Sequence, residues 1–200
     1  MLKNSLLLFF ISLSLSSFSQ HFEGGFFGGF TASQVDGDRF SGYNKVGITA
    51  GAYATKEISR NMNWKTEIRY IQKGAYKKNT EMDPTLFKTS LHYAEIPLIL
   101  QYFYNEKVFF EGGLVPEILL ASKEENEDGI IPDDQSLPFH PFSLEITAGA
   151  GYFFTDNLAA GFRYTYSLLT ARDHASGQTY LLNRGQYNNV LSFTLYYHFR

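Results

Sequence analysis

The sequence feature that most constrains the fold is a two-residue alternation between bulky apolar side chains and small or polar ones. In SLEITAGAGYFF, residues 143–154, the even positions are apolar or aromatic, whereas the odd positions include Glu145, Thr147 and two glycines. LAAGFRYTYSLL, residues 158–169, alternates in the same way. Because successive side chains of a strand point to opposite faces, this period predicts strands with one bulky face and one small, polar face.

The pattern predicts eight strands along the chain of 200 residues. Most are longer than the roughly five or six residues usual in soluble sheets, and long enough for the ~9–11 residues of a tilted membrane-spanning strand. Their expected ranges are 22–34, 44–57, 62–74, 89–104, 107–120, 143–154, 158–169 and 187–199.

The connections between these strands alternate between short and long. Three are the short polar turns ISRNM, NEK and TDN, whereas the other four are much longer, such as ASKEENEDGIIPDDQSLPFHP. A closed meander places every second connection at the same end of the barrel. Tight turns at one end and long loops at the other are typical of bacterial outer-membrane barrels.

The orientation of the two faces distinguishes two barrels. A soluble lipocalin-like barrel would have an apolar interior, but the small, charged face of this chain is too polar to form an apolar core. We therefore expect an all-β fold: an eight-stranded antiparallel up-and-down transmembrane β-barrel with a polar interior and a lipid-facing apolar exterior. Its lumen is expected to hold a network of paired charges, formed by Lys65, Glu67, Arg69, Lys73, Glu95, Glu111, Glu145 and Arg163.

Aromatic residues gather beside the short turns and the C-terminus, where they would form a girdle at the lipid headgroups. They are Tyr102, Tyr104, Phe109, Phe110, Tyr152, Phe154, Tyr197 and Phe199. In the segment HYAEIPLILQYFY, Glu95 and Pro97 would both face inward. Since Pro97 has no N–H to donate, a bulge or an unpaired carbonyl is expected beside it on a neighbouring strand.

The N-terminal residues predict export. Residues 1–19 combine Lys3, an apolar run and small residues at 17 and 19, as a cleaved secretory signal does. The alternative, a retained anchor, would need a longer apolar run. The exported part, residues 20–200, is expected to form the barrel. Its formal charge is -4, from 16 basic and 20 acidic residues once Lys3 is removed, which does not favour nucleic-acid binding.

Several segments carry a family resemblance. KTEIRYIQKGAY, HYAEIPLILQYFY followed by FFEGG, ITAGAGYFF, AAGFRYTYSL and the aromatic C-terminal strand are similar to the PorT-type outer-membrane β-barrel domain family of Gram-negative bacteria. The resemblance implies an outer-membrane barrel, and the namesake branch is associated with protein secretion. Phe199 would serve as the assembly signal for the barrel-assembly machinery, although Arg200 follows it.

Catalytic and metal-binding signals are weak. None of the five histidines has a metal-ligand spacing, and the nearest approach to a nucleophile set is Asp173, His174 and Ser176 in ARDHASGQ. The acidic segment Glu124–Asp134 is expected to be a solvated loop, with divalent-cation binding as the alternative. No cofactor, metal site or catalytic residue is expected.

Two functional hypotheses follow. The first is a structural or interaction protein that acts through its loops, with an accessory role in secretion or surface assembly. The alternative is a barrel that modifies lipid or binds a small molecule. Expected partners are outer-membrane lipid and lipopolysaccharide, the barrel-assembly machinery and an unknown protein, in the outer membrane of a Gram-negative bacterium after Sec-type export.

Overall fold

The computed structural model describes residues 22–37, 42–77, 86–173 and 185–199, with the side chain of Asp133 left out. The predicted signal peptide and the residues His174 and Ser176 lie outside this part of the chain. Among the described residues, no helix is long and apolar enough to cross a membrane.

The described chain is almost entirely β-strand, with one 3-10 turn at Asp133–Gln135. The strands are β1 Phe22–Asp36, β2 Lys45–Ser59, β3 Met62–Lys77, β4 Phe87–Glu95, β5 Leu98–Phe103, β6 Val108–Asn126, β7 Gly129–Ile130, β8 Phe142–Phe153, β9 Leu158–Ser167, β10 Arg172–Asp173 and β11 Gly185–Phe199.

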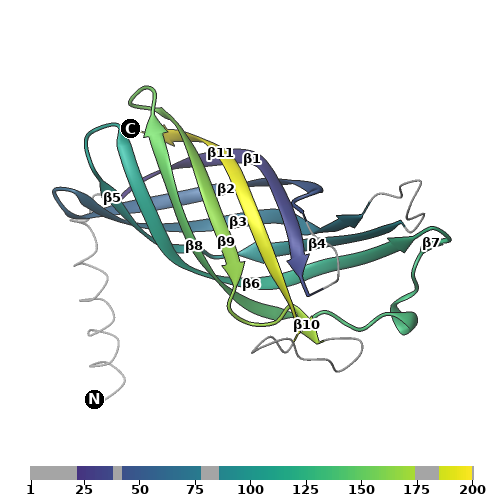
Figure 1. Cartoon of the computed structure of the whole chain (residues 1–200). Coiled ribbons are helices and arrows are strands. Elements are labelled where there is room, and N and C mark those ends of the chain that lie inside the picture. The colour runs from purple at the N-terminus through teal and green to yellow at the C-terminus, as the bar shows by residue number, and fades with distance from the viewer. Residues whose placement is uncertain (1–21, 38–41, 78–85, 174–184, 200) are drawn as a thin grey trace, which may run out of the picture.

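Every strand pair is antiparallel, and neighbours in the sequence are neighbours in the sheet. β4 and β5 are two halves of one strand, because both pair with β3 on one side and β6 on the other. β1 pairs with β2 and also with β11, so the sheet closes on itself. The two-residue strands β7 and β10 only extend the rim. The structure is therefore the predicted eight-stranded antiparallel barrel (Figure 1).

The barrel is apolar outside and polar inside. Ile68 is 74% exposed, whereas its neighbours Glu67 and Arg69 are 0% and 3% exposed. The same contrast runs along the other strands, since most buried residues are polar or charged and the large exposed residues are apolar. An ordinary soluble domain has the opposite arrangement, so the outer wall is suited to lipid, as predicted.

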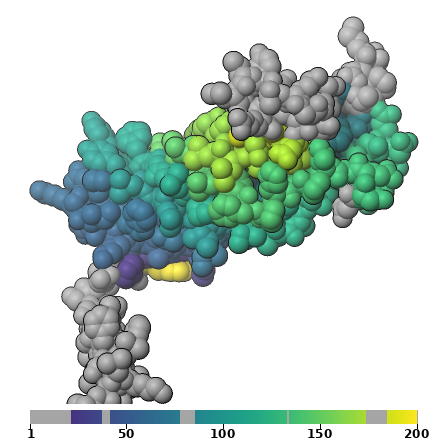
Figure 2. Space-filling view, turned by 90° about the horizontal axis from the view of Figure 1, so that it is seen from below, coloured from purple at the N-terminus to yellow at the C-terminus, as the bar shows by residue number. Residues whose placement is uncertain are grey.

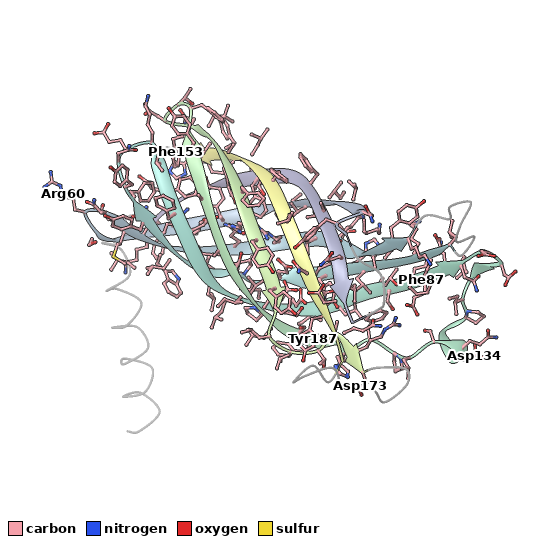
Figure 3. The ribbon with its side chains drawn as sticks, in the orientation of Figure 1. Arg60, Phe87, Asp134, Phe153, Asp173 and Tyr187 are labelled. Carbon is pink, nitrogen blue, oxygen red and sulfur yellow. The ribbon has the colours of Figure 1, made fainter. Side chains whose placement is uncertain are left out.

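The connections at the two ends of the barrel differ in length. The short connections between β2 and β3, β5 and β6, and β8 and β9 share one end, the turn end, where Figure 3 shows Arg60 and Phe153. The other end, the loop end, carries Phe87, Asp134, Asp173 and Tyr187. Figure 2 shows an elongated body with residues of β6 and β7 at the loop end.

Strand β6 is longer than predicted. The expected strand ended at residue 120, whereas β6 continues to Asn126 and contains Glu124 and Glu125, so the first part of the segment expected to be a solvated loop is strand. The continuation is supported by β4, which pairs with β6 from Phe87↔Asn126 onward. By contrast, β6 pairs with β8 only as far as Ile118↔Phe142. β4, β6 and β7, with the end of β3 paired to β4 as far as Lys77↔Phe87, thus form an overhang beyond the last β6–β8 pair.

Pro97 lies in the gap between β4 and β5 without disturbing the register. Arg69↔Glu95 and Thr66↔Leu98 keep the same alignment on β3, and the Glu67 N–H donates to the Pro97 carbonyl at 3.1 Å. The reciprocal bond cannot form because proline has no N–H, so the Glu67 carbonyl on β3 lacks its ladder donor. The bulge in this region instead lies at His92/Tyr93, opposite Leu119 and Ala121 of β6.

Candidate functional site

The eight charged residues predicted for the lumen all point into the barrel and contact one another. Each is at most 6% exposed, because each occupies an inward position of the two-residue period. They divide into two groups along the barrel axis. The Arg163 cluster contains Arg163, Lys65, Glu67 and Glu111, and the Lys73 cluster contains Lys73, Glu95, Glu145 and a ninth residue, Glu117.

Arg163 on β9 is the centre of the first cluster. Its Nη1 and Nη2 donate to the two carboxylate oxygens of Glu67 at 2.8 and 2.6 Å, and its Nε donates to Glu111 at 2.5 Å. Lys65 approaches the same two carboxylates at 3.1 and 3.7 Å, and its ammonium lies 4.0 Å from the ring centre of Tyr196. The bidentate geometry and the two cations offset the cost of burying two carboxylates.

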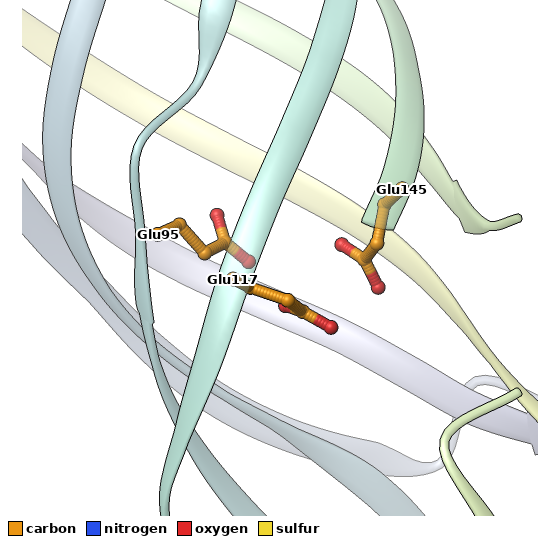
Figure 4. Close-up of side chains that lie close together, drawn as sticks. All are labelled: Glu95, Glu117 and Glu145. Atoms are coloured by element: carbon orange, nitrogen blue, oxygen red, sulfur yellow. The ribbon is translucent and has the colours of Figure 1, made fainter. Parts of the chain in front are cut away.

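Lys73 on β3 is the centre of the second cluster. Its Nζ lies 3.1 Å from Glu95, 2.5 Å from Glu117 and 2.9 Å from Glu145. Figure 4 shows the three carboxylates converging from separate strands. Oxygens of all three lie within 4.8 Å of one another, a spacing that could also hold a metal ion. Here the Lys73 ammonium already contacts all three.

Arg69 joins the two clusters. Its Nη2 lies 3.2 Å from Glu67 and its Nη1 lies 3.5 Å from Glu95. Residues 65, 67, 69 and 73 of β3 therefore bring four of the nine network charges to one strand, and the period-two pattern aims them all inward. The other five charged residues of the network come from β4, β6, β8 and β9.

Glu117 is the member of the network that the sequence prediction missed. Counting by two from Glu111 along β6 reaches residues 113, 115 and 117, all on the inner face. The same count would have found Glu117, but Pro116 and the apolar residues that follow it obscure the alternation. Further toward the loop end, Arg172 and Glu124 form another buried pair at 2.8 Å, and neither was predicted as a lumen residue.

Two apolar layers enclose the charged network. Toward the turn end lie Phe27, Tyr53, Phe109, Ala159 and Tyr196, with Phe103 and Phe153 packed against them. Toward the loop end lie Ile71, Leu91, Tyr93, Phe139, Ala171 and Val190, with Leu119 beside them. An eight-stranded barrel is just wide enough for side chains to fill it, and these layers complete the filling.

Two inward-facing glycines make room for the aromatic rings of the turn-end layer. A Cβ placed on Gly151 would lie 2.1 Å from Cζ of Phe109, and one on Gly51 would lie 2.6 Å from Cζ of Phe27. Because glycine has no side chain, the ring of a residue on the neighbouring strand can approach its backbone closely. Phe109 is therefore only 1% exposed.

The position of Phe109 corrects the predicted girdle. Phe109 shares the inward parity of Glu111, two residues along the strand, so it belongs to the interior layer. The other seven predicted girdle residues lie on the outer face near the turn end, each 42–70% exposed. They are Tyr102, Tyr104, Phe110, Tyr152, Phe154, Tyr197 and Phe199.

The turn end holds a cavity of about 600 Å³ above the aromatic layer. At its wall, the Tyr53 hydroxyl lies 2.9 Å from Nδ1 of His198, and Nε2 of His198 lies 3.0 Å from Glu23. Lys65 and Tyr196 form part of the floor. The cavity is thus separated from the Lys73 cluster by the aromatic layer and the Arg163 cluster.

At the loop end, His140 lies beside Asp173, the one described member of the set Asp173, His174 and Ser176. His140 Nδ1 lies 2.9 Å from the Thr170 carbonyl oxygen, and its Nε2 lies 4.0 Å from Asp173. Asp173 is largely exposed. His174 and Ser176 lie outside the described residues.

Comparisons with known proteins agree with this architecture. Residues 17–170 match the family described as outer membrane protein β-barrel domain. A search of curated proteins gave no significant match.

Among solved structures, the chain is similar to Ail, the attachment invasion locus protein of Yersinia pestis, with 15% identity, a TM-score of 0.52, and coverage of 88% of this chain and 98% of Ail. A second structure of Ail, in complex with the heparin analogue sucrose octasulfate, gives 14% identity, a TM-score of 0.50, and coverage of 90% and 99%. Neisserial surface protein A is 14% identical, with a TM-score of 0.46 and coverage of 89% and 97%.

The family match spans more than half of the sequence, and the fold independently shows a closed barrel with an apolar wall and a charged lumen. Such a barrel is suited to the outer membrane of Gram-negative bacteria. The chain therefore belongs to the outer membrane protein β-barrel domain family.

Proposed function

We propose that this outer-membrane barrel acts as a membrane-anchored interaction protein, without catalysis, and meets a protein partner through its loop end. The observation that carries this proposal is the filled interior. Two apolar layers and a network of nine buried charges occupy the middle of the lumen of the described barrel, and the turn-end cavity stops at them. A filled lumen favours binding at the ends of the barrel over conduction through it.

The overhang at the loop end supports a binding role. β4 and β6 extend past β8, and the end of β3 lies alongside β4. Lys88 on β4 and Lys123 on β6 both pair with Glu125 on the exposed surface of this overhang. Strand extensions of this kind present ordered backbone and fixed charges beyond the membrane. They offer a partner a surface that needs little ordering on binding.

The resemblance to the PorT-type branch suggests the kind of partner. In this proposal the partner is a component of protein secretion or surface assembly, and the chain reaches the outer membrane after removal of residues 1–19 by Sec-type export. The barrel-assembly machinery would insert it, with Phe199 on the final strand as the signal. The seven exposed aromatic residues near the turn end would then lie at the periplasmic headgroups.

Site-specific photocrosslinking in the native membrane tests the proposal. A photoreactive residue at Asp128, at the exposed tip of the overhang, should give a discrete protein adduct. The same residue at Phe162, on the lipid-facing wall, should give none. Protein adducts only from a turn-end position such as Glu106 would contradict binding at the loop end.

The lipid-modifying alternative has its own test. Alanine at His140 should leave the lipid A profile of the membrane unchanged, because the described partners of the His140 ring are the carbonyl and hydroxyl of Thr170 and the exposed carboxylate of Asp173. Alanine at His174 should give the same result. A changed lipid A structure in either variant would favour the enzyme.

A further inference from the structure

The charges in the lumen network do not balance. It contains four cations, Lys65, Arg69, Lys73 and Arg163, and five carboxylates, Glu67, Glu95, Glu111, Glu117 and Glu145. The next buried pair toward the loop end, Arg172 and Glu124, is balanced in itself. Among the residues that the structure describes, one carboxylate charge in the network therefore lacks a compensating cation. A buried unpaired charge is strongly destabilising, so a counter-charge is expected.

The geometry locates this excess in the Lys73 cluster. Glu95 contacts two cations, since its oxygens face Lys73 and Arg69. Glu145 contacts Lys73 and accepts a hydrogen bond from Ser167 at 3.1 Å. Glu117 contacts Lys73 through Oε2, while its Oε1 is buried without a hydrogen-bond partner. Oε2 of Glu145 is also without one.

Buried neutral groups beside the cluster point independently to a ligand. Among the described residues, the Tyr93 hydroxyl and both amide atoms of Asn188 make no hydrogen bond of normal geometry, although the two side chains interact with each other, and both residues are 0% exposed. Tyr93 lies against the cluster, because its ring centre is 4.6 Å from Nζ of Lys73. Asn188 is tied to the cluster through Ser167, whose Oγ accepts from the Asn188 backbone N–H and donates to Glu145.

We propose that Glu117 and Glu145 form a buried proton-binding site, in which the pair holds one proton at neutral pH, mainly on Glu117. A proton supplies the missing positive charge and converts an orphaned acceptor into a donor. A metal ion would supply charge too, but the Lys73 ammonium lies in contact with all three carboxylates and occupies the place that the ion would need. A proton requires no such space.

The groups that determine where the proton binds come from several strands. The charged and titratable ones are Lys73 and Arg69 on β3, Tyr93 and Glu95 on β4, Glu117 on β6 and Glu145 on β8. Like charges that share a site disfavour the ionisation of one another, and here three carboxylates share Lys73. The folded chain would therefore carry one proton that the unfolded chain releases at neutral pH.

Infrared spectroscopy of the wild-type barrel in deuterated buffer is the first test, and it needs no variant. At neutral pH the wild type should show the carbonyl band of a buried protonated carboxyl. The Glu117→Gln variant should lose that band, and Glu67→Gln, whose carboxylate faces three cations, should keep it. Absence of the band from the wild type at neutral pH would overturn the proposal, whether or not a variant folds.

The pH dependence of folding is the second test. If the folded state holds the extra proton, each pH unit above the range of ordinary carboxyl groups should lower the folding equilibrium constant of the wild type up to tenfold relative to Glu117→Gln. At neutral pH, Glu117→Gln should change that constant little. Glu67→Gln should lower it at least about a hundredfold, because it leaves buried cations unpaired. Parallel pH profiles of wild type and Glu117→Gln would contradict the proposal.

Discussion

Ile68 and its two neighbours show how a single position decides between lipid and lumen. Ile68 faces outward between Glu67 and Arg69, which face the lumen. A one-residue shift would place both charges in lipid, where a basic residue at mid-bilayer costs about 2–4 kcal/mol and a carboxylate somewhat less. It would also break the contacts of Glu67 with Arg163 and Lys65. Both the cost of placing a charge in lipid and the ion pairs in the lumen therefore favour this alternation.

The two apolar layers depend on residues that sequence patterns do not single out. Gly151 looks like any small residue of a polar face, yet its missing side chain is the space that Phe109 fills. The sequence could not predict this, because the contact joins neighbouring strands and depends on their register, Phe109↔Gly151. For the same reason Phe109 was wrongly expected in the outer girdle.

Replacing Gly151 with alanine should destabilise the barrel by about 1–3 kcal/mol, because the new methyl group overlaps the ring of Phe109. Gly28→Ala is the matched control, since its Cβ would lie 4.0 Å from the nearest atom, the carbonyl oxygen of Thr49. Unfolding in urea from lipid vesicles gives both free energies of unfolding. Equal values for the two variants would mean that Phe109 does not pack over Gly151.

At the scale of strands, the local pattern predicted most of the barrel. Period-two alternation and the short polar turns located all eight strands, because both are properties of residues close together in sequence. The end of β6 was missed because Glu124 and Glu125 look like loop residues. They are held in the strand by partners that are distant in sequence, Arg172 and Lys88.

The overhang makes a specific prediction for Glu125, which lies beyond the last β6–β8 ladder pair. Hydrogen bonds from Lys123 and Lys88 lower the pKa of its carboxyl group to about 2. Because the pKa is lowered, these bonds stabilise the overhang above the ordinary pKa of Glu, and their contribution is lost as the pH falls toward 2.

Carbon NMR of labelled Glu side chains should follow this titration. In the wild type, the Glu125 carboxyl should titrate near pH 2, and replacing both Lys88 and Lys123 with glutamine should return it toward the ordinary range. An ordinary pKa for Glu125 in the wild type would show that the lysines do not hold it.

The molecule as a whole is a barrel whose core charges lie between two apolar layers and whose bulky apolar face is suited to lipid. The charge network was anticipated as a set of inward charges, but its division into two clusters was not. That division depends on strand stagger, which places Arg163 opposite Glu67, 96 positions apart in the sequence. No local pattern carries such information.

The barrel has its apolar face toward lipid and its polar face toward the lumen. This orientation can be measured directly, because the sequence contains no cysteine. Single cysteines carrying nitroxide spin labels would be placed at Ile48 and Tyr164 on the outer wall, and at their inward neighbours Thr49 and Thr165. In lipid vesicles, the labels at Ile48 and Tyr164 should be highly accessible to oxygen dissolved in the bilayer, and those at Thr49 and Thr165 should be protected. The reverse pattern, with the Thr positions in contact with lipid, would contradict the account.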